Sequence, residues 1–459
     1  MTNTFTNIGF IKFSELYNWS VGNLLGNLFT YNKEFPLVKI RMFLTKSNNQ
    51  IVIQNELVYK RVTVKINNGG VIQRDTEKGN KIGTKRQFIV NSDQFIISKI
   101  DARNGAMGLI PKELDGAIVT NDFPTFNIDL NSILPQFLLL ITTTTEFVEF
   151  AQSCSSGTTN RQRIDINKFL NVKIPLPPLN DEDAYKKNLP NTFTQEKLIE
   201  SYNRNINKAK KLKFKAIEIE DEIETYILDE LKINKSKKDD VSSGLNFYKF
   251  KDLERWDVWA FKSSSSSKTY SFLKFRDILL DKPVYGANVK GVKKKSETRY
   301  IRITDINEDG GLNDDLVYPE FVEEKFVLNE NDFLIARSGN TVGKTFLYKP
   351  SFGRAIFAGY LIKFHLNLDM VIPEYVLAYT KSTIFKKWVN SNQRISGQPN
   401  INAQEYLEFP IIIPDKKTQK KIVTVISNIR NEIKSLLNHS EDLEQRAIKD
   451  FEKTIFKSE

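Results

Sequence analysis

Apolar residues recur at steps of three and four positions in two long segments of the chain, and this spacing predicts two amphipathic helices. The first stripe runs from Leu198 to Ile227 and the second from Ile422 to Ile455. Lys and Glu alternate over the remaining positions, as is typical of solvent-exposed helix faces. Each helix of about 40 residues measures about 60 Å. A helix of this length with one apolar stripe needs a partner, which predicts a coiled coil between the two.

The alternative is that each helix packs only on the globular segment that precedes it. A globule of about 180 residues is only about 35 Å across. A helix of about 60 Å would extend well beyond such a globule. The length of the two stripes therefore favours the coiled coil.

The segments that precede the two helices follow the same order of apolar, polar and glycine positions. Phe88–Phe95 matches Phe326–Phe333, and the register continues without a gap for about 60 residues. Each segment starts near a tryptophan, Trp19 or Trp256, and ends on an apolar strand punctuated by prolines. Such self-similarity indicates a duplicated structural unit.

The order of these elements predicts an α+β fold of two tandem repeats, each a mixed, strand-rich globule followed by a long helix. The polar segment 234–246 is the predicted linker between the halves. The predicted domains are a first globule at 1–178, a helical region at 179–243 with its helix at about 194–233, a second globule at 244–413 and a second helical region at 414–459.

Composition favours a nucleic-acid partner and excludes several kinds of site. The 459 residues carry 67 Lys and Arg against 56 Asp and Glu, a net charge of +11, and such an excess suits a polyanionic partner. One cysteine, Cys154, cannot form an intrachain disulfide, and with only His365 and His439 it cannot build a His/Cys zinc site. No apolar run approaches the roughly 20 residues of a membrane span, and the start of the chain lacks a signal-peptide pattern. We therefore expect no membrane partner and a cytoplasmic location.

Motifs that could carry catalysis are incomplete. Gly339–Thr345 resembles a phosphate-binding loop, but Ser338 stands where the first glycine belongs, so the spacing that aims successive amides at phosphate is lost. A nuclease-like pattern begins at Pro414-Asp415, but its Glu432 and Lys434 fall on a predicted helix, whereas metal-binding carboxylates converge from neighbouring strands. No glycine fingerprint for adenosylmethionine and no credible set of Ser or Cys with His is present. We expect no catalytic residue, metal site or cofactor on this chain.

Basic and polar residues fall at predicted loops of both globules and are the candidates for contact with nucleic acid. Arg and Lys neutralise phosphates, and Arg, Asn and Gln also form paired hydrogen bonds with base edges. The repeat places Lys99 opposite Arg337, which suits phosphate contact in both halves, whereas Asn104 meets Val342, which suits base reading that differs between halves, or no role. The alternative for each residue is ordinary solvated charge. The candidates are Lys81, Lys85, Arg86, Lys99, Arg103, Asn104, Arg161, Arg163, Lys293, Lys294, Lys295, Arg299, Arg337, Asn340, Lys344, Gln398 and Asn400.

Short motifs accompany the repeated architecture. They are Arg255-Trp256-Asp257-Val258, Ser98–Ala106, Gly397–Ile401, Ile174–Pro178, Ile413-Pro414, Thr194-Gln195 and Thr418-Gln419. Together with the two globules and two helices, they resemble the specificity (S) subunit of type I restriction–modification systems over essentially the whole chain. One departure is an insertion at 180–191, between the proline strand and the first helix.

The resemblance implies that each globule is a target-recognition domain that reads one half of a bipartite double-stranded DNA target. It implies that the helices pack antiparallel and fix the spacer between half-sites, since about 60 Å of helix exceeds one DNA turn of about 34–36 Å. The implied partners are two modification (methyltransferase) subunits per chain and the restriction, or translocase, subunits. Adenine-N6 methylation with adenosylmethionine, and cleavage with ATP and Mg, would belong to those partners, and this chain would be non-catalytic.

Two alternatives stay open at the level of the sequence. One is the recognition subunit of a type II-like methyltransferase or nuclease assembly, which the identity of the partner would distinguish. The other is a coiled-coil scaffold that binds no DNA. Binding by such a scaffold would be insensitive to salt, whereas phosphate-driven DNA binding weakens steeply as the salt concentration rises.

Overall fold

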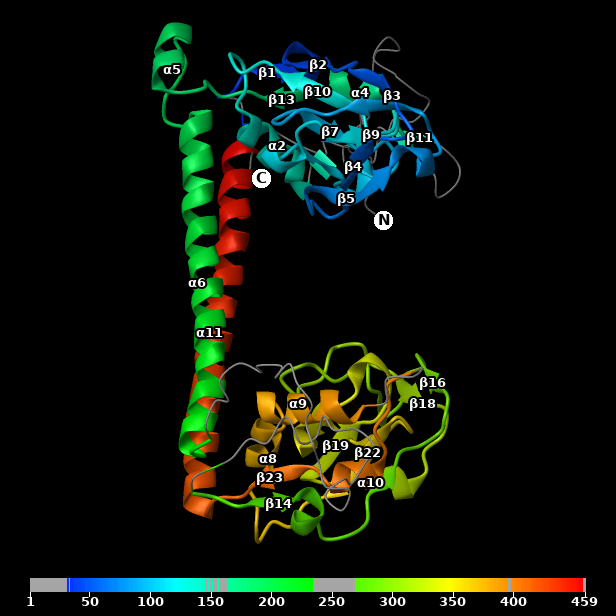
Figure 1. Cartoon of the computed structure of the whole chain (residues 1–459). Coiled ribbons are helices and arrows are strands. Elements are labelled where there is room, and N and C mark those ends of the chain that lie inside the picture. The colour runs from blue at the N-terminus through cyan, green and yellow to red at the C-terminus, as the bar shows by residue number, and fades with distance from the viewer. Residues whose placement is uncertain are drawn as a thin grey trace, which may run out of the picture. The chain divides into compact units, whose positions relative to one another are not determined.

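The computed structural model describes residues 31–32, 34–145, 147–148, 151, 155–156, 163–233, 267, 269–393 and 398–456. The chain divides into two compact units (Figure 1). Unit 1 comprises Met1–Lys211 and His439–Glu459, and unit 2 comprises Leu212–Asn438. Several residues that the sequence analysis singled out lie outside the described residues, namely Trp19, Cys154, Arg161, the linker 234–246, Arg255–Val258 and Gly397.

Two sheets form the frame of unit 1. The first is antiparallel and runs in the order β2 (Leu44–Lys46), β10 (Thr125–Ile128), β7 (Phe95–Ile97) and β8 (Met107–Leu109). The second runs in the order β3 (Gln50–Val52), β6 (Arg86–Ile89), β9 (Ile118–Val119), β4 (Val58–Val64) and β5 (Val71–Lys78), with β4 and β9 parallel. Two further antiparallel pairs are β1 (Leu37–Lys39) with β13 (Lys173–Pro175), and β11 (Ser155–Ser156) with β12 (Arg163–Ile164). The insertion at 180–191 contains a short helix, α5 (Asp181–Lys187).

The core of unit 1 joins the antiparallel sheet to α2 (Pro135–Thr143), α4 (Ile166–Asn171) and the last turns of α11 (Lys416–Ile455). Phe95, Phe126 and Phe137 have no exposed surface. Phe451 of α11 packs edge-on against Phe137, with the ring centroids 5.9 Å apart. Because burying one such ring contributes about 1.5–3 kcal/mol, the C-terminal end of the chain is an integral part of this unit.

Unit 2 repeats the antiparallel sheet with equivalent strands. The order is β15 (Val284–Tyr285), β22 (Leu361–His365), β19 (Asp332–Ala336) and β20 (Thr345–Leu347). The pairs are β14 (Phe272–Lys274) with β23 (Pro410–Ile412), β16 (Gly291–Val292) with β18 (Tyr318–Pro319), and the parallel β17 (Arg299–Ile301) with β21 (Ala355–Phe357). The helices are α8 (Pro373–Tyr379), α9 (Thr383–Asn392) and α10 (Ala403–Leu407).

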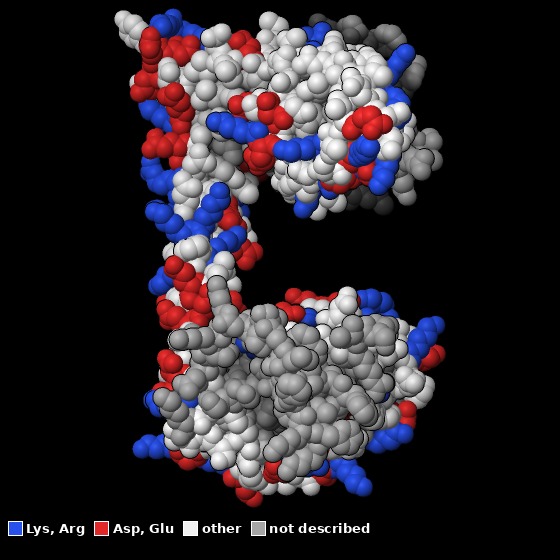
Figure 2. Space-filling view, in the orientation of Figure 1, with Lys and Arg blue, Asp and Glu red and all other residues white. Residues whose placement is uncertain are grey.

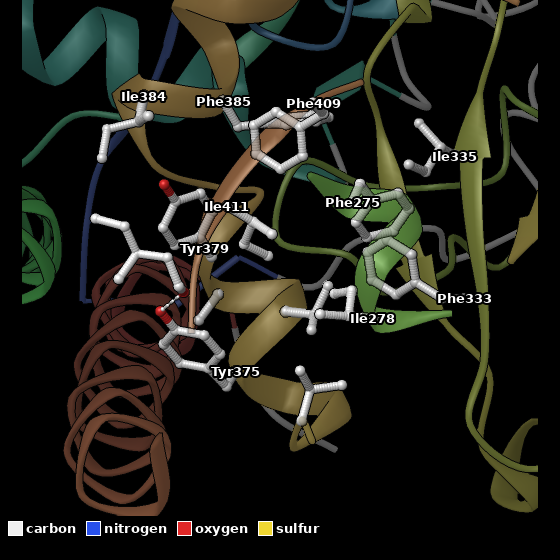
Figure 3. Packing of buried hydrophobic residues seen from close by; sticks show 14 of the residues in the cluster. Phe275, Ile278, Phe333, Ile335, Tyr375, Tyr379, Ile384, Phe385, Phe409 and Ile411 are labelled. Atoms are coloured by element: carbon white, nitrogen blue, oxygen red, sulfur yellow. Dashed lines mark hydrogen bonds between the residues drawn. The ribbon is translucent and has the colours of Figure 1, made fainter. Parts of the chain in front are cut away.

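Aromatic side chains fill the core of unit 2 (Figure 3). Phe275 lies between the sheet and β23, with its ring centroid 5.2 Å from that of Phe364 and 6.1 Å from that of Phe409. The Tyr375 hydroxyl, which is fully buried, donates a hydrogen bond to the carbonyl of Ile412 (2.6 Å). This bond satisfies the one polar atom of the ring and ties α8 to β23.

A buried glutamine fastens the start of α6 (Gln195–Glu230) to the globule of unit 1. Gln195 has no exposed surface. Its Oε1 accepts a hydrogen bond from the Leu134 N–H (2.8 Å). Its Nε2 donates to the carbonyls of Ser132 (3.1 Å) and Pro177 (2.9 Å). One side chain therefore joins the long helix, the start of α2 and the proline strand.

Gln419 near the start of α11 makes the same three bonds in unit 2. It is also fully buried. Its Oε1 accepts from the Ile372 N–H (2.8 Å), and its Nε2 donates to the carbonyls of Met370 (3.0 Å) and Pro414 (2.8 Å). The partners occupy matching positions of the two repeats, so the duplication extends to individual hydrogen bonds.

The long helices pair with antiparallel polarity (Figure 1). In unit 2, Lys215 forms an ion pair with Glu432 (3.2 Å) and Lys421 forms one with Glu230 (2.6 Å). Residue numbers thus fall along α11 as they rise along α6. The predicted α+β fold of two repeats with an antiparallel helix pair is confirmed.

A buried serine lies inside the helix pair, and charged side chains lie on its exposed faces. In unit 1 the buried Ser440 hydroxyl donates to the carbonyl of Ala209 (3.0 Å), and both residues have no exposed surface. The ends of the helices also join the globular cores, with Leu198 in unit 1 and Ile227 and Ile422 in unit 2. Side chains of both signs line the exposed faces (Figure 2). The helices therefore pack on each other as well as on the globules, which agrees with the predicted helix pair and not with packing on the preceding globule alone.

Candidate nucleic-acid interface

Lys99, two residues after β7, and Arg337, directly after β19, have the same backbone surroundings in the two units. In unit 1 the Lys99 N–H donates to the carbonyl of Asp122 (2.8 Å), and the carbonyl of Lys99 accepts from the N–H of Ile164 (2.8 Å). In unit 2 the Arg337 N–H donates to the carbonyl of Tyr360 (2.9 Å). The carbonyl of Arg337 then accepts from the N–H of Ile401 (2.9 Å). Lys99 and Arg337 therefore occupy equivalent places in the fold, as the sequence register predicted.

In unit 1 this place is surrounded by an excess of positive charge. Arg163 pairs with Asp122 at 3.2 Å, and 59% of its side chain remains exposed. Burial lowers the pKa of Lys99, and the nearby charges of Lys46 and Arg163 lower it further against the opposing effect of Asp122. One carboxylate thus faces three cations in this cluster. An added phosphate would relieve the repulsion among the cations.

In unit 2 the place equivalent to Lys99 is built around an aromatic ring. The Arg337 guanidinium lies over the ring of Tyr285, 4.9 Å from its centroid. The Tyr285 hydroxyl accepts a hydrogen bond from the N–H of Ala403 (3.1 Å), which fixes the ring at the start of α10. The sequence analysis did not identify Tyr285, because nothing in the sequence links β15 to the loop after β19.

The turn after Arg337 brings three further candidates to the same loops. Ser338 pairs with Asn400 in an isolated antiparallel bridge, and the Gly339 N–H donates to the carbonyl of Pro399 (2.9 Å). Gly339 has φ +72°, and a Cβ there would lie 3.3 Å from Nε2 of Gln398. Asn340 and Gln398 are exposed and Asn400 is half-buried. Sequence-distant polar residues therefore meet here because the backbone turns through a left-handed glycine.

Other candidates already bind groups of their own unit. The Lys85 ammonium donates to Asn55 (2.9 Å) and to the carbonyl of Gly79 (2.7 Å). Lys344 pairs with Glu308 at 2.8 Å. Lys293 pairs with Asp315, and Arg299 donates to the carbonyl of Asn313 (2.7 Å). The exposed ion pair of Lys293 is weak, and Lys85 and Arg299 donate to neutral oxygens, so these three cations remain candidates for phosphate contact. Lys344, whose side chain is 24% exposed, is more enclosed than Lys293.

The rest of the predicted set is distributed over the two globules. Lys81 lies 3.9 Å from Glu77 and is mostly exposed. Arg103 is half-buried on a short 3-10 turn after Lys99. The candidates with high exposure are Arg86, Asn104, Lys294 and Lys295. DNA contact by each of the seventeen candidates stays a prediction.

Asp122 and Tyr360 also belong to these loops, and Lys46 lies beside them at the end of β2; the sequence analysis missed all three. Asp122 and Tyr360 stand at matching positions of the repeat, so the register contained a signal that could have found them. Their difference in chemistry, a carboxylate in unit 1 and an exposed phenol in unit 2, distinguishes the two loops. Lys46 is placed there only by the pairing of β2 with β10.

The incomplete motifs have structural roles. In the phosphate-loop-like segment, the N–H of Gly343 donates to Ala336 (3.0 Å) and that of Lys344 to Thr341 (3.0 Å), so neither is aimed at a ligand. Asp415 caps α11 by accepting from the Thr418 N–H (3.0 Å). Within the described ranges there is no group of three His, Cys, Asp or Glu residues arranged to hold a metal ion. Across the same ranges, none of the helices combines the length and apolar character that a membrane crossing requires.

Comparison with protein families decides what this arrangement is. The model described as "Type I restriction modification DNA specificity domain" matches the chain twice, over residues 32–186 and 287–445. The chain belongs to this family. It is a non-catalytic DNA sequence-recognition subunit with two recognition domains, one in each unit. The resemblance inferred from the sequence is thereby confirmed.

One solved structure, with a TM-score above 0.5, shares the fold of this specificity subunit, and two others match it at lower scores. A chain from the work described as "Structural basis underlying complex assembly and conformational transition of the type I R-M system" is 13% identical with a TM-score of 0.57, covering 93% of this chain and 98% of its own. The HsdS subunit from Thermoanaerobacter tengcongensis is 13% identical with a TM-score of 0.41, covering 92% of this chain and 97% of its own. The S subunit from M. genitalium is 10% identical with a TM-score of 0.43, covering 95% and 98%. No curated protein sequence matches the chain.

Proposed function

We propose that this specificity subunit directs a type I restriction–modification complex to a bipartite DNA target. In this complex two modification subunits per chain carry out the methylation, and restriction, or translocase, subunits carry out the cleavage. The observation that supports the proposal best is the duplicated backbone frame that holds Lys99 in one unit and Arg337 in the other. Two equivalent frames with different side chains suit two half-sites with different sequences.

Partner subunits would supply the chemistry that this chain lacks. Adenosylmethionine for adenine-N6 methylation would bind to the modification subunits, and ATP and Mg to the restriction subunits. The fold-level likeness to a chain from a type I R-M complex is in keeping with such an assembly. Large apolar side chains on α6, with Phe214 62% exposed and Ile217 60% exposed, are the kind of surface that a partner subunit covers. We place the complex in the cytoplasm, where its DNA substrate is.

The helix pair would set the spacer between the half-sites. The helix α6 has 36 residues and α11 has 40, which at 1.5 Å per residue corresponds to about 54–60 Å of helix. Small buried contacts such as Ser440 with Ala209 make slippage between the helices costly. A helix pair with fixed register suits a target whose gap has a fixed length.

Genome-wide mapping of adenine methylation, with and without the gene, tests this proposal. We expect one split motif with a fixed gap to lose its methylation when the gene is deleted. Co-purification of the tagged chain from the same strain should recover a methyltransferase subunit. Methylation that is unchanged in an active strain, together with purification free of any methyltransferase, would contradict the proposal.

Salt dependence gives an independent check on the assembled complex. Each phosphate contact releases counterions, so the logarithm of the binding constant should fall linearly with the logarithm of the salt concentration. Binding to a duplex that carries the mapped motif should therefore weaken steeply between low and moderate salt. A complex that binds equally at both salt concentrations does not use the cationic loops.

A further inference from the structure

Arg337 differs from the other candidate cations in what holds it. Its guanidinium lies 4.9 Å from the centroid of the Tyr285 ring. Its Nε is enclosed without a hydrogen-bond partner, and no residue of the described chain accepts a hydrogen bond from its terminal nitrogens. By contrast, Lys344 is paired with Glu308 and Arg163 with Asp122. Arg337 is thus oriented by a ring and not by a carboxylate.

A guanidinium held in this way is oriented to donate two hydrogen bonds to a planar acceptor. Stacking on an aromatic face fixes the plane of the group without using its N–H donors. The ring itself is fixed, because the Tyr285 hydroxyl accepts from the Ala403 N–H (3.1 Å). The two terminal nitrogens then form a rigid fork, and the base edge that matches such a fork in the major groove is guanine, through O6 and N7.

The equivalent place in unit 1 has neither the fork nor the ring. Lys99 carries a single ammonium group, which contacts phosphate as a point charge. The strand equivalent to β15 is β2, which ends in Lys46 and is followed by Ser47 and Asn48, so this segment brings no aromatic side chain to the place that Tyr285 occupies in unit 2. Lys99 lies instead among Lys46, Arg163 and Asp122. The two half-site readers therefore differ at the same backbone position.

We propose that Arg337 reads a guanine in the half-site bound by unit 2, and that Tyr285 is the positioning residue that orients its guanidinium. Lys99 contributes charge to the equivalent place in unit 1 without selecting a base. This assignment refines the sequence-based interpretation, which gave both residues the same phosphate-contacting role. It rests on DNA recognition by the two units, and it does not depend on the spacer or on the number of partner subunits.

The test uses the complete complex purified with its methyltransferase subunits. Binding is measured with a set of duplexes that carry the mapped motif, each with one base pair changed. The Arg337→Lys variant keeps the positive charge and removes the fork. We expect it to lose about tenfold or more of the discrimination at one guanine of one half-site, with the other half-site and the gap unchanged. The Arg337→Gln variant should shift the preference at that position towards adenine, because Gln pairs with adenine N6 and N7.

Matched variants separate positioning from structure. Tyr285→Leu removes the ring and should relax the same guanine position, whereas Tyr285→Phe keeps the ring and should keep most of the discrimination. Lys99→Arg, at the equivalent place in unit 1, should leave every base preference unchanged. A uniform loss of affinity for all duplexes in Arg337→Lys, with a smaller salt slope, would overturn the assignment and make Arg337 a phosphate contact. A wild-type complex that recognises no split motif would contradict the proposed assembly instead, so the two failures are distinguishable.

Discussion

The buried glutamine at the start of each long helix predicts a large and local loss of stability when its amide is removed. In Gln419→Leu, three backbone groups lose their partners, namely the N–H of Ile372 and the carbonyls of Met370 and Pro414. Each buried group left unsatisfied costs about 1–3 kcal/mol. The N–H has the largest cost, because a carbonyl keeps a second lone pair for another donor.

The net effect follows from these terms. Three unsatisfied groups together cost about 4–6 kcal/mol, and burying the leucine side chain offsets about 2 kcal/mol of this. We therefore expect unit 2 to lose about 3 kcal/mol of unfolding free energy, a factor of more than 100 in the open population. The loss should appear as faster hydrogen exchange in α8 and β23, the two elements that Gln419 connects to α11.

Hydrogen–deuterium exchange read by mass spectrometry resolves the two units in one experiment. Gln195→Leu is the matched control, since Gln195 makes the same three bonds in unit 1. That variant should accelerate exchange in α2 and leave α8 unchanged. Exchange in α8 of Gln419→Leu that stays within about 1 kcal/mol of wild type would refute the reasoning, because it would show that the three bonds do not support the junction.

Three further outcomes are expected. Arg337→Ala should lower the affinity of the assembled complex for its target duplex in a gel shift, and unchanged binding would remove this residue from the interface. Adding four residues to both long helices lengthens each by about 6 Å, so the methylated motif should gain a longer gap, and a motif with its original gap would contradict the spacer role. Burial lowers the pKa of Lys381 from 10.5 to about 8, with the charge of Arg430 adding to the effect. The folded state therefore binds this proton less tightly than the unfolded chain does. The loss of folding stability caused by burying the charged ammonium is full below pH 8 and disappears as the pH rises towards 10.5. Denaturant unfolding should show wild type gaining about 3 kcal/mol relative to Lys381→Met between pH 7 and pH 10.5, whereas a difference that does not change with pH would show that Lys381 does not titrate in this way.

The sequence by itself determined the features that depend on local periodicity. Steps of three and four apolar residues predict a helix wherever it packs, so α6 and α11 follow from the pattern alone. The repeat can also be recognised from the sequence, since matching positions of the two units need similar side chains to fill equivalent cores. The excess of Lys and Arg and the lack of a catalytic set narrowed the function to recognition of a polyanion.

Tertiary structure alone decided which distant residues meet. The contact of Arg337 with Tyr285 depends on the pairing of β15 with β22 and of β22 with β19, and no local pattern encodes that pairing. The same holds for Phe451, which completes the core of unit 1 from the opposite end of the chain. The sequence analysis recognised Gln195 and Gln419 as parts of motifs. Their role could be assigned only from the structure, which shows the backbone groups that they hydrogen-bond. The physical reason is that the buried positions of a helix or strand recur along the chain with a regular period, whereas hydrogen bonds and ring contacts depend on how separate segments pack.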